Sequence, residues 1–483
     1  MQDTENGVDR EIGSGQLKHQ VADTMRQRID AGTYRPGDKL PSIRELSRAL
    51  QVSVTTVKGA YAILEIDGYV VVHQQSGIYV RLRSPLVKSS QRTNPPATPV
   101  MMTLQENLDG TISSSVQVRK RLLSAGSPND DQLPTRGINA AIKRVALQAG
   151  NIHIRYSESR GLQELREQIA QNSMLKGCVL DPDQIVVTNG CTEALVLALQ
   201  TVVQPGEIVA VESPAYPGLL NAMKSQGLRI LEVPSFPDDG IDVEALEALV
   251  TQFPIAAVFV TPNFCNPTGA RIPIASRQRM VKMLGERDIP LIEDDIYGDL
   301  TFDLRPIPTC KAFDEKGLVL LCSSFSKTLS PGLRVGWIAG GRFDGQLLAR
   351  KSASTVCTGA LSQMIVSEFL REHRFSRVIA KASTAYGKNM HSLTACVRRT
   401  FPSGTVVAPP AGGFLLWVQM PVNFSSKRLL ELSTKEGIIF VPGFKYSAHA
   451  MYGNCLRISA TYWDKDVEAQ VTRLGELAAS AQM

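Results

Sequence analysis

The chain has 483 residues, of which 43% are hydrophobic and 20% charged, and its formal net charge is +6. This length predicts about three domain-sized units, and the composition excludes a wholly disordered or fibrous protein. No apolar run approaches the ~20 residues of a membrane span, and the polar first fifteen residues lack the pattern of a secretory signal. We therefore expect a cytoplasmic protein without a membrane segment.

Eight cysteines are scattered along the chain, without a C-x-x-C pair and without a histidine at metal-ligand spacing. This usage predicts reduced thiols rather than a disulfide framework, and no metal site.

The positive charge is concentrated near the N-terminus. Residues 12–83 contain ten Lys or Arg and six Asp or Glu, a net charge of +4. A small basic module ahead of a nearly neutral body indicates nucleic-acid contact, although a solvated surface can carry the same charge.

The N-terminal module reads as three helices and a hairpin. A first helix has an apolar face formed by Leu17, Val21, Met25 and Ile29. Ser42 and Glu45 have the S-x-x-E spacing of a capping box that opens a second helix, which runs to about Leu50. Ser53 is a plausible N-cap of a third helix, which ends at Gly68 and turns inward the apolar residues Val57, Ala60, Ile63 and Leu64. Tyr69–His73 and Ile78–Arg81 alternate around QQSG as a β-hairpin.

This order of elements is that of a winged helix-turn-helix. In that geometry the recognition helix enters the DNA major groove by its N-terminal end. We expect the following residues there to face DNA: Ser53, Thr55, Thr56 and Lys58. Arg44 would face the DNA backbone or groove edge, and hydroxyls and a lysine suit phosphate contact. Each of these residues taken alone could equally belong to a solvated helix face.

The segment PGDKLPSIRELSRALQVSVTTVKGAYAILEIDGYV resembles the DNA-binding domain of the GntR family of bacterial regulators, over nearly all of residues 12–83. Val54 stands where many relatives have Arg, and Gln74 or Gln75 where the wing has Gly. Base reading from position 54 is therefore not expected.

Residues 84–116 are expected to be a linker, because residues 84–105 contain four prolines and no periodicity. From 117 to 475, strand-like runs alternate with helical stretches, which is typical of a doubly wound α/β domain with a largely parallel sheet. The runs are Ile185–Val187, Ile208–Val211, Ala256–Val260, Pro290–Ile292, Val319–Cys322 and Val335–Ala339. The large part covers about 140–340, and a smaller α+β subdomain with strands in GGFLLWVQM and NCLRISATY covers about 375–475.

Four motifs lie at predicted strand ends: TNGCT (188–192), NFCNPTG (263–269), EDDIY (293–297) and SSFSK (323–327). Because ligands bind at the carboxyl ends of strands in α/β sheets, these motifs are expected to meet in one crevice. Pyridoxal 5'-phosphate requires a lysine amine for its Schiff base and a carboxylate for its pyridine nitrogen. Its phosphate favours a helix N-terminus with hydroxyl and arginine partners.

The set resembles the fold-type I aspartate aminotransferase family over about residues 117–475. The resemblance implies that Lys327 forms the Schiff base (the internal aldimine), that Asp294 pairs with the pyridine nitrogen, and that Asn266 and Tyr297 bind the ring oxygen. The residues implied for the phosphate are Gly190, Cys191, Thr192, Ser324 and Arg334.

Three further roles follow from the same resemblance. Tyr216 stacks on the ring, Tyr156 reaches the phosphate of the neighbouring subunit, and Arg457 grips an α-carboxylate, a bidentate task that suits guanidinium.

Simpler interpretations stay open for several of these residues. Asp295 could face the ring instead of Asp294, although the D-x-x-Y spacing to Tyr297 favours Asp294. Tyr216 could be core packing, and Arg457 could be structural. Cys191 is expected to contribute its amide rather than a reactive thiol.

The two halves together resemble the MocR family of regulators, a winged helix fused to an aminotransferase-like domain. The resemblance implies a homodimer with head-to-tail exchange of the DNA-binding modules, a double-stranded DNA operator, and an amino-acid or amine effector. It implies a pyridoxal phosphate-dependent transcription regulator. The alternatives are a working aminotransferase that carries a DNA-binding module, and a fold that has lost the cofactor and serves dimerisation.

Overall fold

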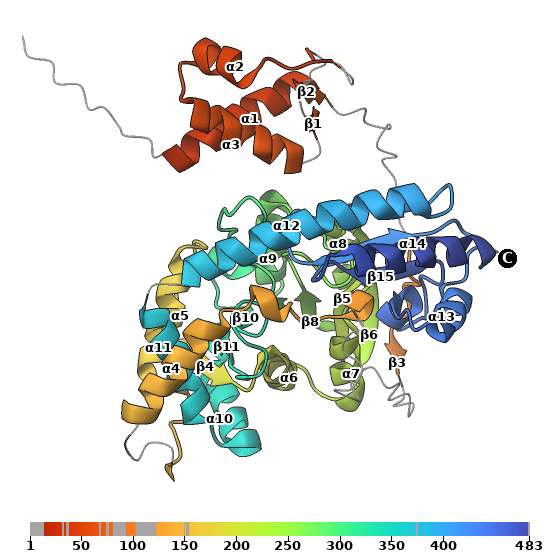
Figure 1. Cartoon of the computed structure of the whole chain (residues 1–483). Coiled ribbons are helices and arrows are strands. Elements are labelled where there is room, and N and C mark those ends of the chain that lie inside the picture. Colours follow the sequence, from red (N-terminus) through yellow and green to blue (C-terminus); the bar gives the residue numbers. More distant parts are fainter. Residues whose placement is uncertain are drawn as a thin grey trace, which may run out of the picture. The chain divides into compact units, whose positions relative to one another are not determined.

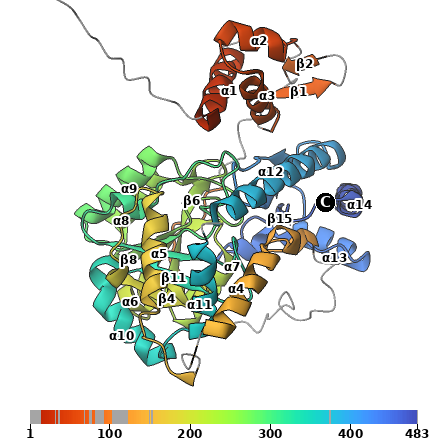
Figure 2. The same cartoon turned by 60° about the vertical axis from the view of Figure 1, so that its left-hand side comes forward.

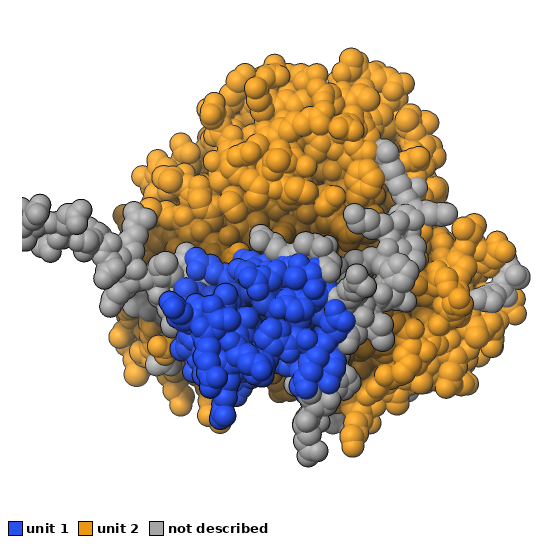
Figure 3. All heavy atoms as spheres, turned by 90° about the horizontal axis from the view of Figure 1, so that it is seen from above, with its two compact units in different colours: residues 1–88 blue, residues 89–483 orange. Residues whose placement is uncertain are grey.

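The computed structural model describes residues 14–30, 33–34, 38–66, 69–73, 77–80, 93–102, 122–148, 150, 154–372 and 375–481. The chain divides into two compact units, residues 1–88 and 89–483 (Figures 1 and 3). Within the described residues, no helix has the length and apolarity to cross a bilayer. All eight cysteines lie in the described part, and all are free thiols, as expected.

The first unit contains the predicted three helices and hairpin (Figure 2). Its elements are α1 (Ser14–Asp30), α2 (Ile43–Leu50), α3 (Val54–Ile66), β1 (Val70–His73) and β2 (Gly77–Val80). The strands pair antiparallel, with Val70 opposite Val80. Gly68, the expected end of the third helix, lies outside the described residues.

The core of this unit forms between α1 and α3. Met25 of α1 and Val57, Ala60 and Leu64 of α3 are fully buried, which confirms the two predicted apolar faces. Apolar burial of this kind is the main source of stability in so small a unit.

Capping bonds fix where α2 begins. The Glu45 amide donates to Ser42 Oγ at 3.3 Å, and the Ser42 amide donates to Glu45 Oε2 at 2.7 Å, which is the predicted capping box. Gln51 adopts a left-handed conformation with φ 52° and ends the helix.

A nine-stranded sheet in the order β3-β6-β5-β8-β9-β10-β11-β4, with β7 paired to β6, organises the described part of the second unit. The strands are β3 (Val100–Met101), β4 (Ile185–Thr188), β5 (Ile208–Ser213), β6 (Arg229–Phe236), β7 (Gly240–Ile241), β8 (Ile255–Val260), β9 (Leu291–Asp294), β10 (Val319–Ser324) and β11 (Gly336–Ala339). Strands β6, β5, β8, β9 and β10 run parallel, as predicted, and β11 runs antiparallel to both β10 and β4.

Helices cover both faces of this sheet (Figures 1 and 2). One face packs on α6 (Cys191–Val202), α7 (Pro217–Ser225) and α10 (Asp344–Thr355). The other face packs on α8 (Val243–Gln252), α9 (Ile274–Glu286), α4 (Thr135–Gln148), α5 (Gln163–Met174) and α11 (Ala360–Arg371). Strand β10 shows the alternation directly, since Cys322 faces α6 and Leu321 faces the opposite side.

The antiparallel β11 brings two segments of one loop to the same sheet edge. The chain leaves β10 at Ser324, turns through residues 325–335, and returns into β11 at Gly336. Both ends of this turn therefore lie at the carboxyl edge of the parallel strands.

Part of the predicted linker belongs to the sheet. Val100 and Met101 form β3, which pairs antiparallel with Ile230 and Arg229 of β6. An edge strand tolerates neighbouring prolines because only one of its sides needs hydrogen bonds. Residues 81–92 and 103–121 lie outside the described residues.

A smaller α+β subdomain follows, as predicted. It contains α12 (Phe375–Thr400), β12 (Val406–Val407), β13 (Leu415–Gln419), α13 (Ser426–Lys435), β14 (Val441–Pro442), β15 (Cys455–Ser459) and α14 (Lys465–Ser480). Its four strands form an antiparallel sheet in the order β12-β13-β15-β14. Leu393 of α12, Leu416 of β13 and Leu474 of α14 are buried in one core.

We predict that Ser42→Ala lowers the free energy of unfolding of the first unit by about 1 kcal/mol, because one half of the capping box is lost. Denaturant unfolding followed by amide exchange in α2 measures this change. Thr24→Ala is the matched control, since within the described part of the chain the Thr24 hydroxyl bonds only to the Gln20 carbonyl of its own helix. Equal stability of Ser42→Ala and the wild type would contradict the prediction.

Candidate functional site: a half-buried lysine at the sheet edge and an exposed helix start

Lys327 lies at the carboxyl edge of the sheet, where the predicted motifs meet. Its Nζ donates to the Gly126 carbonyl at 2.5 Å and lies 5.9 Å from the centroid of the Tyr297 ring. Tyr297 is buried and packs edge-on against Phe414, with ring centroids 5.5 Å apart. The amine therefore sits in an enclosed place with an aromatic wall.

The Lys327 amine is shifted toward its neutral form. Burial lowers its pKa to about 8, the positive charge of Arg457 acts in the same direction, and the negative charge of Asp294 opposes them. A neutral lysine amine is the form that adds to a carbonyl group.

Asp294, and not Asp295, shares this environment. Asp294 Oδ1 accepts the Ile296 amide at 3.1 Å and the Cys191 thiol at 3.4 Å. Burial raises the pKa of Asp294 to about 6, although the bonds from Cys191 and Ile296 oppose the shift. Asp295 instead pairs with Lys176 at 2.8 Å and accepts the Asn263 side-chain amide at 2.7 Å.

The Cys191 thiol thus does more than the sequence suggested. Its contact with Asp294 adds a side-chain role to the expected amide role. Burial raises its pKa well above the usual value, so it stays a thiol rather than a reactive thiolate.

The start of α6 and the start of β11 touch through their backbones. A Cβ at Gly336 would lie 2.5 Å from the Gly190 carbonyl carbon, which no side chain tolerates. Gly190 has φ +82°, and a Cβ there would lie 2.3 Å from Arg334 Nη2. Glycine is therefore required at both positions, and the guanidinium of Arg334 lies directly over the turn that opens α6.

Arg334 also bonds to the segment between β4 and α6 and to the turn between β10 and β11. Its Nη2 donates to the Asn189 carbonyl at 3.1 Å, and its Nη1 donates to Ser326 Oγ at 3.4 Å. The backbone N–H groups in the first turn of a helix have no partner within the helix. Arg334 and the start of α6 together form a place suited to an anion.

Ser326, which the sequence reasoning did not single out, is the hydroxyl beside Arg334. Ser324 lies deeper, where its Oγ donates to the Val335 carbonyl at 2.9 Å and contacts Ser326 Oγ at 2.8 Å. The S-x-S-K spacing immediately before Lys327 was the available signal. Thr192, at the second position of α6, is exposed.

Two of the buried polar atoms that have no partner among the described residues belong to predicted site residues. They are Oδ1 of Asn266 and Nε of Arg457, in side chains that are only 8% and 4% exposed. Arg457 Nη2 donates to the Ser124 carbonyl. Buried polar groups in native proteins are nearly always paired. The Nε of Arg457 is thus a donor that an acidic ligand could satisfy, whereas the Oδ1 of Asn266 is an acceptor.

Tyr216 and Tyr156 are surface residues rather than core residues. Tyr216 is 37% exposed and its ring covers the first turn of α7, since a Cβ at Gly218 would lie 2.4 Å from the ring. Tyr156 is 87% exposed.

A cavity of about 280 Å³ adjoins this site through Ser324. Ser323, Phe325 and Phe375 of α12 also line it, while Lys327 and Asp294 do not.

In the first unit, the start of α3 presents a polar exposed surface. Thr55 and Lys58 of α3, Ser53 before it and Arg44 in the first turn of α2 are exposed. Thr56 differs from the expectation, because it is only 7% exposed and its Oγ1 contacts Ser53 Oγ at 2.8 Å.

The Ser53 hydroxyl also accepts the Thr56 amide at 3.0 Å, as the predicted N-cap does. Thr56 is buried because it follows the same helical face as Ala60, four residues later, which packs against α1. We therefore remove Thr56 from the surface that could meet DNA.

Two family models match the chain. The bacterial regulatory proteins of the gntR family match residues 17–80, and the aminotransferases of class I and II match residues 119–474.

Whole-length relatives carry both parts. The helix-turn-helix-type transcriptional regulator YjiR of Escherichia coli is 34% identical over 439 residues, which cover 91% of this chain and 93% of the relative. The regulator YdcR of the same organism is 30% identical over 463 residues, which cover 95% of this chain and 98% of the relative.

A solved enzyme structure matches the second unit. LysN, an α-aminoadipate aminotransferase from Thermus thermophilus complexed with N-(5'-phosphopyridoxyl)-L-leucine, superposes with a TM-score of 0.70 and 29% identity. The match covers 77% of this chain and 96% of that one.

We predict that the Lys327 amine of the cofactor-free protein reacts with amine-directed reagents with a midpoint near pH 8, because only the neutral amine reacts and its pKa is about 8. Asp294→Asn removes a charge that raises this pKa and should lower the midpoint, whereas Arg457→Gln should raise it. Peptide mapping of labelled Lys327 across a pH series measures the midpoint. A wild-type midpoint at the ordinary lysine value of 10.5 would contradict the prediction.

Proposed function

The chain belongs to the MocR type of helix-turn-helix regulators, with a gntR-type domain ahead of an aminotransferase class I and II domain. On this basis we propose that it regulates transcription in response to an amino-acid or amine effector. The effector would bind beside Lys327, with pyridoxal 5'-phosphate as cofactor. The observation that carries this proposal is the half-buried amine of Lys327, with its lowered pKa, close to Asp294 in a chain that also contains a winged helix.

The residues around Lys327 fit this cofactor. When bound, pyridoxal phosphate supplies an aldehyde and an electron-accepting ring, with which amines condense. Lys327 would hold the aldehyde carbon, Asp294 the pyridine nitrogen, and Asn266 and Tyr297 the ring oxygen. Tyr216 would cover one face of the ring.

The phosphate would lie at the start of α6. Its oxygens would accept the amides of Gly190, Cys191 and Thr192, and Arg334 would neutralise part of its charge. Ser324 and Ser326 would complete this set, with Ser326 supplying the hydroxyl that contacts Arg334.

Arg457 would hold the effector's carboxylate. Its Nε is buried and has no partner among the described residues, so an incoming carboxylate would satisfy an otherwise unpaired donor. Because Arg457 lies in β15 of the small subdomain and Lys327 follows β10 of the large part, an effector held by both would bias how the two parts close.

The proposed DNA contacts are Arg44, Ser53, Thr55 and Lys58. Arg44 and Lys58 would neutralise phosphates, and Thr55 would reach the groove. Ser53 would donate its hydroxyl proton to a phosphate oxygen, because its capping bond uses the oxygen only as an acceptor.

The proposed organisation is a cytoplasmic homodimer. We assign residues 12–83 to the DNA-binding domain, 84–116 to the connecting segment and 117–475 to the aminotransferase-like domain. The high exposure of Tyr156 supports a role toward the phosphate of a neighbouring subunit. Head-to-tail exchange of the DNA-binding modules is proposed from the family resemblance.

A working aminotransferase that carries a DNA-binding module is the second candidate. The complete set of side chains around Lys327, and the structural likeness to an aminotransferase, favour it. The two candidates differ in turnover, since a sensor binds its effector without releasing a product.

We predict that one or a few members of a panel of amino acids and amines change the visible absorbance of the cofactor-loaded protein and its DNA affinity at the same concentration. Arg457→Gln should weaken the response to amino acids at least tenfold, because a hydrogen-bonded charge pair is lost, and should leave amines without a carboxylate unaffected. Lys327→Ala should abolish the absorbance response.

Steady production of a keto acid with multiple turnovers would favour the second candidate. Absorbance changes without any effect on DNA affinity would contradict the regulator proposal.

We predict that Lys58→Ala and Arg44→Ala weaken binding to duplex DNA from upstream of the protein's own gene, and lower the slope of log affinity against log salt by about 1 each. Fluorescence anisotropy over a salt series measures both quantities. Lys282→Ala, an exposed lysine of α9 in the second unit, is the matched control and should bind as the wild type does. Unchanged affinity and slope in both variants would refute the proposed DNA surface.

A further inference from the structure

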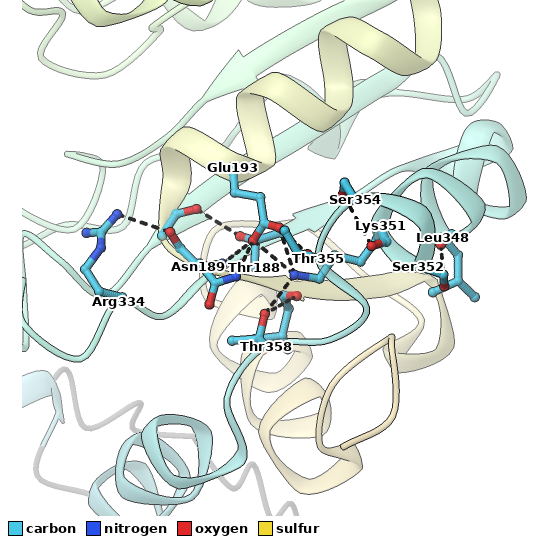
Figure 4. A network of polar contacts seen from close by, with 12 residues as sticks. Thr188, Asn189, Glu193, Arg334, Leu348, Lys351, Ser352, Ser354, Thr355 and Thr358 are labelled. Atoms are coloured by element: carbon cyan, nitrogen blue, oxygen red, sulfur yellow. Dashed lines mark hydrogen bonds and ion pairs between the residues drawn. The ribbon is translucent and has the colours of Figure 1, made fainter. Parts of the chain in front are cut away.

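A buried ion pair between Glu193 and Lys351 contacts the turn that opens α6. Figure 4 shows Glu193, in the first turn of α6, facing Lys351 and Thr355 at the end of α10. Lys351 Nζ donates to both carboxylate oxygens of Glu193, at 2.9 and 3.0 Å, and the Thr355 hydroxyl donates to Oε1 at 2.6 Å. The Lys351 side chain is 0% exposed.

Glu193 holds the backbone of the preceding turn. Its Oε2 accepts the Asn189 amide at 2.5 Å and the Asn189 side-chain amide at 3.0 Å. Burial raises the pKa of Glu193, but the bonds from Asn189, Thr355 and Lys351 outweigh it and lower the pKa on balance, so Glu193 is a carboxylate. The carbonyl of the same Asn189 accepts Arg334 Nη2 at 3.1 Å.

Lys351 is itself anchored to the sheet. Its third proton goes to Thr358 Oγ1 at 3.0 Å, and the Thr358 hydroxyl donates to the Val187 carbonyl of β4 at 3.0 Å. The chain of contacts therefore runs from β4 through Thr358, Lys351 and Glu193 to Asn189, and back to the end of the same strand. Each proton of the ammonium group has an acceptor, which a fully buried lysine requires.

The charges of this pair matter to an anion at the start of α6. A carboxylate in the first turn would repel a phosphate bound to the same turn. Lys351 compensates that charge, so the turn keeps the bonds that Glu193 supplies without its repulsion.

We propose that Glu193 and Lys351 are positioning residues for the cofactor's phosphate: the pair fixes the Asn189–Gly190 turn and the carbonyl that orients Arg334, and so sets the affinity of the site for the phosphate group. This inference rests on the proposed cofactor. It adds two residues that touch neither the ring nor the reacting atoms, and that act through Asn189 and Arg334.

A purely structural ion pair predicts a different result. It would change the stability of the whole unit and weaken every ligand of the site alike. A positioning pair weakens only ligands that carry the phosphate. Pyridoxal, which has the same ring and aldehyde without the phosphate, separates the two roles.

The experiment compares the affinities of full-length, cofactor-free protein for pyridoxal phosphate and for pyridoxal, from the visible absorbance gained on binding. In Lys351→Met we expect the preference for the phosphorylated form to fall about tenfold or more, as loss of an outer partner commonly does to a bound group. Lys311→Met is the control, because Lys311 forms a comparable buried pair with Asp314 at 2.7 Å, outside the residues assigned to the cofactor. Its preference should stay at the wild-type value.

A second variant covers the case in which Lys351→Met does not fold. Thr355→Val removes one exposed hydroxyl that donates to Glu193 and should reduce the preference about threefold. Ser352→Ala, one turn earlier on α10, should not, because among the described residues the hydroxyl it loses bonds only to the Leu348 carbonyl.

An unchanged preference in Lys351→Met or, if that variant is unfolded, in Thr355→Val overturns the inference while leaving the cofactor proposal intact. A wild-type protein that gains no absorbance with pyridoxal phosphate refutes the proposed function itself.

Discussion

The contact between two backbones, at Gly190 and Gly336, is the constraint on which the rest of the site depends. Strand β11 can lie beside β4 only if its first residue passes the start of α6 without a side chain. Because β11 is antiparallel to β10, this same approach carries Arg334 over the α6 turn and leaves Lys327 near Asp294. A side chain at either glycine would push apart the start of α6, which follows β4, and the turn that joins β10 to β11.

Around this contact, charged side chains are stabilised by ion pairs rather than by exposure to solvent. Glu193 and Lys351 neutralise each other beside the turn, and Asp295 is compensated by Lys176. Lys327 donates to a carbonyl and has no carboxylate in ion-pair contact among the described residues, so its charged form is less stabilised. Its lowered pKa increases the share of neutral amine, which its proposed chemistry needs.

The sequence predicts the helices and strands better than it predicts the tertiary contacts between them. Apolar runs located the central strands, and the capping box at Ser42 located α2, because these signals are local. The expectation that Thr56 faces DNA was wrong, although the local pattern held the signal, since Thr56 shares a helical face with Ala60 four residues on. The bond from Lys327 to the Gly126 carbonyl spans 201 residues, and that from Lys351 to Glu193 spans 158. Local patterns carry no information about such pairs, because tertiary packing brings them together.

Strand β3 gives the connecting segment a structural role in the sheet, besides joining the two units. Residues 100–101 complete the hydrogen bonds of β6 at the outer edge of the sheet, and prolines at 95, 96 and 99 sit just before them. The aminotransferase match begins only at residue 119. A truncated protein that starts there would leave the Arg229–Ile230 backbone unpaired on an open edge, where a strand from another molecule could add. The connecting segment therefore also covers the outer edge of β6, and a truncated second unit that keeps this pairing has to include residues 100–101.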